Sequence, residues 1–112
     1  MADSPADAPA DPIVTDQPDR ERFEVTVGDE LAGFAMYHRI GENRDFTHTE
    51  IDNRFEGQGL GSTLIRAALD ATRADGLGVI PHCPFVRRFI ERHAEYVELV
   101  PAKRRPEFGL SG

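Results

Sequence analysis

The sequence predicts a small α/β domain in which antiparallel strands lead into a strand, a loop, a helix, a parallel strand and a second helix. Apolar and polar residues alternate through much of residues 22–51, which is typical of half-buried strands. From residue 60 the apolar residues recur at helical spacing, and a short run at 77–80 is apolar on both faces. A mixed central sheet with two helices is therefore expected.

Three strands are expected in succession, at residues 22–27, 31–40 and 46–51. The first alternates apolar with polar side chains, the second is more apolar, and the third is rich in threonine and bulky residues. Gly28–Glu30 and Gly41–Asp45 are short polar segments with a glycine, as tight turns require. Strands joined by such turns pair as an antiparallel meander.

An amphipathic helix of about four turns should follow, because Leu60, Leu64 and Ala68 repeat at helical spacing. Gly76 ends this helix. The apolar run 77–80 then predicts a central strand that a crossover brings parallel to an earlier one.

A second helix is expected over residues 84–93, with Pro84 at its first position, where a missing N–H costs nothing. Its pattern predicts that Phe85, Phe89 and Ile90 face the core and that the arginines face outward.

The two ends of the chain predict a different behaviour. The first 19 residues hold five aspartates, four prolines and no basic residue, so residues 1–20 are expected to form a disordered leader. Residues 101–112 mix prolines, glycines and the basic cluster 103–105, which favours a flexible tail. The folded domain is expected over residues 21–100.

Composition excludes several classes of protein. The chain has 112 residues with 13 Lys and Arg against 20 Asp and Glu, a net charge of −7, which disfavours nucleic-acid binding. A single cysteine forms no intramolecular disulfide and no multi-thiolate metal site, so we expect no metal and a cytoplasmic location. No segment has the length of a membrane span or the pattern of a signal peptide, so no membrane partner is expected.

A glycine-rich loop joins the third strand to the first helix at residues 53–62. Glycines at 57, 59 and 61 let a backbone approach a ligand closely, and N–H groups at a helix N-terminus bind phosphate. The loop lacks the GK pair of a P-loop, and its GxGxG spacing is not the dinucleotide fingerprint. It therefore predicts a different kind of phosphate site.

Three segments together resemble the GNAT superfamily of acyl-CoA-dependent N-acetyltransferases, in particular its short YjdJ-type branch. They are HTE at 48–50, GQGLGS at 57–62 and PHCPFVRRFIERHAEY at 81–96. The resemblance covers the expected core from Phe46 to Val97 and implies a minimal GNAT-like fold. It implies that acetyl-CoA lies in the wedge between the third strand and the strand at 77–80.

The resemblance also implies which residues hold the cofactor. They are Glu56, Gly57, Gln58, Gly59, Leu60, Gly61, Ser62, Cys83, Pro84 and Arg87. Glu56 departs from the superfamily pattern, which has Gln or Arg at this position. Unlike those side chains, a carboxylate cannot donate a hydrogen bond to phosphate. Arg54, Arg87 or Arg88 is expected to supply the missing positive charge.

Three residues are candidates for catalysis. His48 and Glu50 are two apart on a strand, so they share a face, and they suit a base that removes a proton from an ammonium group. Cys83 precedes Pro84 at a helix N-terminus, where a thiolate is stabilised. His82 is expected to be structural or exposed.

The mechanism and the acceptor stay open in the sequence. Direct attack of the amine on the thioester is favoured over a ping-pong route through acetyl-Cys83. The short chain implies a shallow acceptor groove, so the unknown amine belongs to a protein or binds a site that a partner completes. A CoA-binding module without catalysis and a thioesterase-like activity are the alternatives.

Overall fold

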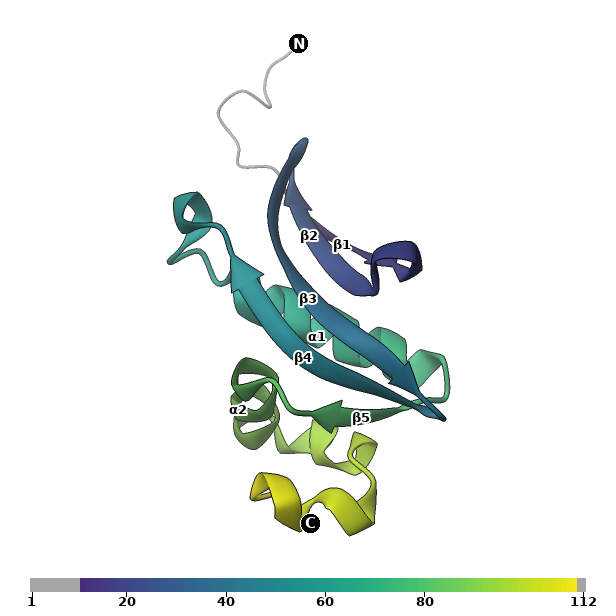
Figure 1. The fold of residues 1–112 in the computed structure, drawn as a ribbon. Helices are drawn as coiled ribbons and strands as arrows, with labels where there is room; N and C mark the ends of the chain where they lie inside the picture. Colours follow the sequence, from purple (N-terminus) through teal and green to yellow (C-terminus); the bar gives the residue numbers. More distant parts are fainter. Residues whose placement is uncertain (1–10, 111–112) are drawn as a thin grey trace.

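The computed structural model describes residues 11–110, which form a five-stranded mixed sheet with two α-helices (Figure 1). The strands and helices are β1 (Pro12–Gln17), β2 (Arg22–Val27), β3 (Glu30–Ile40), β4 (Asn43–Ile51), α1 (Leu60–Ala74), β5 (Gly78–Pro81) and α2 (Pro84–Arg92). Every strand and helix expected from the sequence is confirmed, with small shifts in the bounds. β1 was not expected.

The sheet follows the order of the chain, β1-β2-β3-β4-β5. The first four strands pair antiparallel and β5 pairs parallel with β4, so the predicted meander and crossover are both confirmed. The register with β4 shifts between Met36 and Tyr37: Met36 pairs with His48, and Tyr37 pairs with Phe46. Thr47 is thus an extra residue in β4, as in a β-bulge.

The prediction of a disordered leader is wrong for residues 12–20, and residues 1–10 lie outside the described part of the chain. β1 pairs with β2 along its whole length, and a 3-10 turn at Pro18–Arg20 follows it. Val14 packs against the core, and Asp16 accepts a hydrogen bond from Tyr37. A charged segment is ordered here because the edge of a formed sheet supplies its backbone partners and Tyr37 and Arg44 meet its aspartate.

The predicted flexible tail is also structured as far as residue 110. Two 3-10 turns, Ala102–Arg104 and Pro106–Phe108, follow Val100, and both Phe108 and Leu110 are buried. The prolines and charged residues of this segment suggested a flexible tail, although its two large apolar side chains pack into the fold. The folded part of the chain therefore extends beyond the expected boundary at residue 100.

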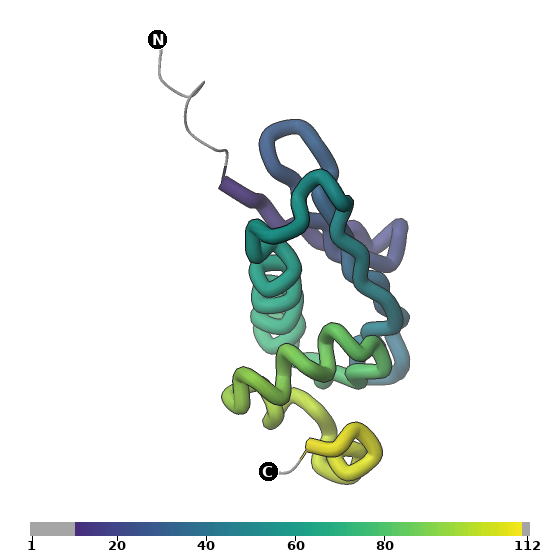
Figure 2. The backbone as a smooth tube through the Cα atoms, turned by 90° about the vertical axis from the view of Figure 1, so that its left-hand side faces the viewer, coloured from purple at the N-terminus to yellow at the C-terminus, as the bar shows by residue number. Residues whose placement is uncertain are grey.

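The core lies between the sheet and α1. Figure 2 shows α1 on one side of the sheet, with α2 extending to the same side. Rings of Phe23, Tyr37 and Phe46 cluster under α1, with centroids 5.3–6.2 Å apart. In the described chain no α-helix covers the opposite face, where Arg22 lies over the Phe34 ring at 4.5 Å. This opposite side is called the open face below.

A buried arginine joins three elements of the fold. The Arg44 side chain, 9% exposed, donates to Asp75 at 2.8 Å and to Thr72 at 3.1 Å, both in or next to α1. It also lies 3.5 Å from a carboxylate oxygen of Asp16 in β1. Its guanidinium stacks over the Tyr37 ring, 5.1 Å from the centroid. Arg44 thus connects β4, α1 and β1.

The hydroxyl of Tyr37 should make stability fall at high pH. Burial, and then the hydrogen bond that it donates to Asp16 at 2.6 Å, raise the pKa of Tyr37 from 10.0 to about 12. Between these values the folded protein keeps a proton that the unfolded chain loses, so the free energy of unfolding falls as pH rises. Urea unfolding at several pH values above 9 is expected to show a smaller decline in Tyr37→Phe than in the parent. An equal decline in both proteins would contradict this.

Candidate functional site

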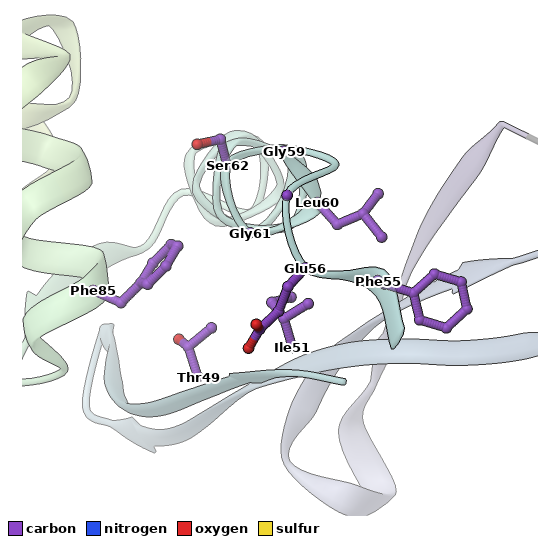
Figure 3. A pocket seen from close by; sticks show the side chains of 10 residues that line it. Thr49, Ile51, Phe55, Glu56, Gly59, Leu60, Gly61, Ser62 and Phe85 are labelled. Atoms are coloured by element: carbon purple, nitrogen blue, oxygen red, sulfur yellow. The ribbon is translucent and has the colours of Figure 1, made fainter. Parts of the chain in front are cut away.

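β4 and β5 separate where their ladder ends. The last pair is Phe46 with Pro81, which has no N–H, and the Cys83 N–H then donates to the Phe46 carbonyl at 2.8 Å. β4 continues to Ile51 without a β5 partner. A cavity of about 380 Å³ adjoins this free part of β4 (Figure 3). Its lining is Thr49, Ile51, Phe55, Glu56, Gly57, Gly59, Leu60, Gly61, Ser62 and Phe85.

The glycine loop forms the wall of the cavity at the start of α1. Gly57 and Gly59 have φ values of +83° and +73°, in the left-handed region that favours glycine. Gly59 is the N-cap of α1, so the N–H groups of the first turn have no acceptor within the helix. Together with the helix dipole, these donors make this end of the cavity suited to an anion.

Phe85 is a wall of the cavity and not a core residue, contrary to the sequence prediction. It is 39% exposed, whereas Val86, Phe89 and Ile90 bury the inner face of α2. A Cβ on Gly61 would lie 2.5 Å from the Phe85 ring, so glycine at 61 permits this ring to pack on α1 (Figure 3). The prediction is thus wrong for Phe85, whose place in the core is taken by Val86, and it is confirmed for Phe89 and Ile90.

Glu56 extends from the loop toward β4 and puts a carboxylate in the cavity lining (Figure 3). This charge opposes the positive end of α1. For CoA bound with its phosphates at this loop, Glu56→Gln should raise the affinity about fivefold, because a like-charge repulsion near a protein surface costs on the order of 1 kcal/mol. Calorimetric titration of both proteins at low salt checks this. Equal or weaker binding by the variant would mean that the carboxylate does not face the phosphates.

His48 and Glu50 share a face, as predicted, and the His48 N–H donates to Glu50 at 2.8 Å. Neither residue lines the cavity. Thr49, which lies between them in the sequence, lines it instead. Their side chains are 52% and 61% exposed and belong to the open face, where the His48 ring is 6.3 Å from Phe34. Alternation alone predicts two faces of a strand, but not which of them α1 covers.

Cys83 lies at the N-cap of α2 and is only 3% exposed. Its sulfur is hydrogen-bonded to the Thr49 hydroxyl at 3.4 Å, and Thr49 lines the cavity. Cys83 therefore does not line the cavity itself and contacts it through Thr49. Pro84 is exposed at the first position of α2 and is not part of the lining.

His82 has a structural contact, in agreement with its expected role. Its Nδ1–H donates to Asp45 at 2.8 Å, and its ring meets that of Phe108 edge-on at 5.2 Å. This pair attaches the C-terminal turns to the end of β5.

The three arginines considered for the phosphate site are in different surroundings. Arg54 contacts Asp52 and Glu30, so its charge is already paired. Arg87 lines neither this cavity nor the neighbouring one. Arg88 lines a second cavity that shares Ser62 and Phe85 with the first.

Most of the predicted glycine-loop residues do line the cavity, with the exception of Gln58. Sequence reasoning missed Thr49, Ile51, Phe55 and Phe85. The alternation of β4 could have revealed Thr49 and Ile51, once the face toward α1 was known. Nothing in the pattern of α2 distinguished Phe85 from a core residue.

A family model described as GCN5-related N-acetyl-transferase matches residues 22–99. The chain therefore belongs to the GCN5-related N-acetyltransferase family, and the expected GNAT-like fold is confirmed.

The structure is also similar to the NMR solution structure of a GCN5-like protein from Staphylococcus aureus. That match has a TM-score of 0.61 and 19% identity, and covers 80% of this chain and 87% of that one. No curated protein matches the chain. Among the residues described, no helix is long and apolar enough to cross a membrane.

Proposed function

We propose that the chain binds acetyl-CoA in the cavity beside β4 and transfers the acetyl group to an amine. The observation that carries this proposal is the separation of β4 from β5 next to an anion-binding helix start. Family membership supports acyl transfer, and the cavity offers a free strand edge and backbone N–H groups to one elongated ligand.

The pyrophosphate would lie at the loop 57–62, where the backbone supplies donors without side chains. The pantetheine arm would run along β4 from Ile51 toward Thr49, because this edge has unpaired N–H and C=O groups. The thioester would then lie near Thr49 and Cys83, which are hydrogen-bonded to each other.

Direct transfer needs a neutral amine on one side of the thioester and a proton for the departing thiolate. The pair His48 and Glu50 lies on the open face and is accessible to a large acceptor. It would take a proton from the acceptor ammonium, directly or through water. The amine nitrogen would then attack the carbonyl carbon and release a second proton to the same base, and the C–S bond would break as the sulfur of CoA takes up one proton. Since the nitrogen loses one proton in forming the amide and the sulfur gains one, the transfer itself is balanced.

A ping-pong route through Cys83 is the second mechanism. The Cys83 sulfur would take the acetyl group and pass it to the amine. Its burial and its hydrogen bond to Thr49 favour the direct route, in which Cys83 donates a proton to the CoA thiolate.

Intact-mass spectrometry with acetyl-CoA, with release of free CoA followed in parallel, tests the proposal. The assay is run on the parent, Cys83→Ala and Glu50→Gln. Each protein is given a lysine-containing peptide or spermidine as the acceptor. The direct route predicts no acetylated protein and CoA release that depends on the amine. An adduct that is absent from Cys83→Ala would support the ping-pong route.

The same experiment addresses the other candidates. If CoA binds and turnover is absent with every amine tested, the chain acts as a CoA-binding module. CoA release without an amine would indicate thioesterase activity. If CoA does not bind, the proposed function is wrong. A cytoplasmic location is part of the proposal, because a protein that uses acetyl-CoA needs access to that pool.

A further inference from the structure

A second cavity of about 250 Å³ continues the first along α2. It is lined by Ser62, Phe85, Arg88, Phe89, Arg92 and His93. Since Ser62 and Phe85 line both cavities, the two form one groove that passes the N-terminus of α1. The part of the groove beyond Ser62 is called the α2 end.

The α2 end is basic. Arg88 and Arg92 are four residues apart on the outward side of α2, so their side chains emerge on one face. Both are exposed, and none of the ion pairs among residues 11–110 involves them. By contrast, Arg66 and Arg73 on the neighbouring α1 each contact a glutamate. Two guanidinium groups next to an anion-binding loop are therefore available for a ligand.

His93 completes this end in a fixed position. Its Nδ1–H donates to the Phe89 carbonyl at 2.9 Å, and its ring stacks on Phe89 with centroids 4.1 Å apart. The floor of the α2 end is thus aromatic and its rim carries positive charge. An anion with an attached organic ring fits this combination.

We propose that Arg88 and Arg92 bind the 3′-phosphate of coenzyme A. This inference rests on the proposed function, which puts the pyrophosphate at the loop that ends in Ser62. With the pantetheine arm along β4, the ribose continues from the pyrophosphate in the other direction, into the α2 end. A phosphate monoester carries nearly two negative charges and three acceptor oxygens, which match the planar donor groups of arginine.

The test compares dissociation constants for CoA and 3′-dephospho-CoA at one ionic strength. The parent is expected to bind CoA about 100-fold more tightly than 3′-dephospho-CoA, because each arginine adds a charge-assisted contact that is worth about tenfold. Arg88→Ala and Arg92→Ala should each weaken CoA binding by about tenfold and leave 3′-dephospho-CoA unchanged. The double variant should bind both ligands equally.

Arg87→Ala is the matched control, because it removes the same charge from the same helix at a position outside both cavities. It should keep the preference for CoA. Circular dichroism confirms that the variants of these surface residues stay folded.

The outcomes separate this inference from the proposed function. If neither ligand binds, the proposed function fails and the inference fails with it. If both bind equally to the parent, or if the double variant keeps the preference, only the 3′-phosphate site is wrong. An equal loss in Arg87→Ala would show that the general charge of α2 acts, and would also overturn the site.

Discussion

Gly59→Val is expected to abolish CoA binding. Gly59 has a φ of +73°, and a β-branched residue is strained there or moves the loop to another conformation. Such strain costs about 1–3 kcal/mol of stability, and its relief turns the N–H donors of the loop away from the bound anion. Losing two hydrogen bonds to a charged group should lower the affinity about 100-fold or more. The Cβ itself would meet open space, so the effect comes from the backbone and not from a clash.

Gly76→Val is the matched control for this result. Gly76 has the same φ of +73° but lies beyond the other end of α1. Both variants should lose comparable stability in urea, and only Gly59→Val should lose CoA in calorimetric titration. Retained affinity in Gly59→Val would show that the phosphate does not bind at this loop.

The second large effect is expected from Arg44→Ala, on stability. Removing a nearly buried guanidinium leaves Asp16, Asp75 and Thr72 without their common donor and exposes the ring of Tyr37. We expect a loss of about 2–3 kcal/mol in the free energy of unfolding, because a charge-assisted hydrogen bond and the stacking on Tyr37 are lost while the two carboxylates stay partly exposed to water. Urea unfolding of the two proteins at neutral pH measures this.

Two further variants show that the loss comes from the position of Arg44. Arg44→Lys should recover only part of it, because an ammonium group neither forks between two partners nor stacks like a guanidinium. Arg54→Ala removes an exposed ion pair with Asp52, which water and salt screen, and should change the free energy of unfolding far less than Arg44→Ala. A loss in Arg44→Ala no larger than in Arg54→Ala would contradict the proposed importance of this buried connection.

The meander, the crossover and both helices could be predicted because each has a strong local pattern. Alternation identifies the strands, glycine turns separate them, and Gly76 and Pro84 mark helix ends. β1 was missed because its order comes from the partner strand β2 and from Arg44, and no pattern within its own residues shows this. The burial of Phe108 was missed because it too depends on a residue distant in the sequence, His82, against which its ring packs.

The candidate site was predictable in its glycine loop and less so in its strand. The loop requires positive φ angles, which leave a visible trace as glycines at 57 and 59. The side of β4 that faces the loop depends on how α1 packs, which the sequence does not reveal at Thr49. Arg88 forms no ion pair among the described residues because the fold brings no carboxylate close to it. The spacing of residues along the sequence could not predict this.

The order of the strands has a consequence for folding and for the site. β1 to β4 join through short turns, so each pairing closes a small loop at low entropic cost, whereas β5 must pair across the whole of residues 52–77. This ladder of four residue pairs should therefore form late in folding and open first in native-state hydrogen exchange. Since the groove begins where the ladder ends, a bound ligand should slow amide exchange there more than elsewhere in the sheet.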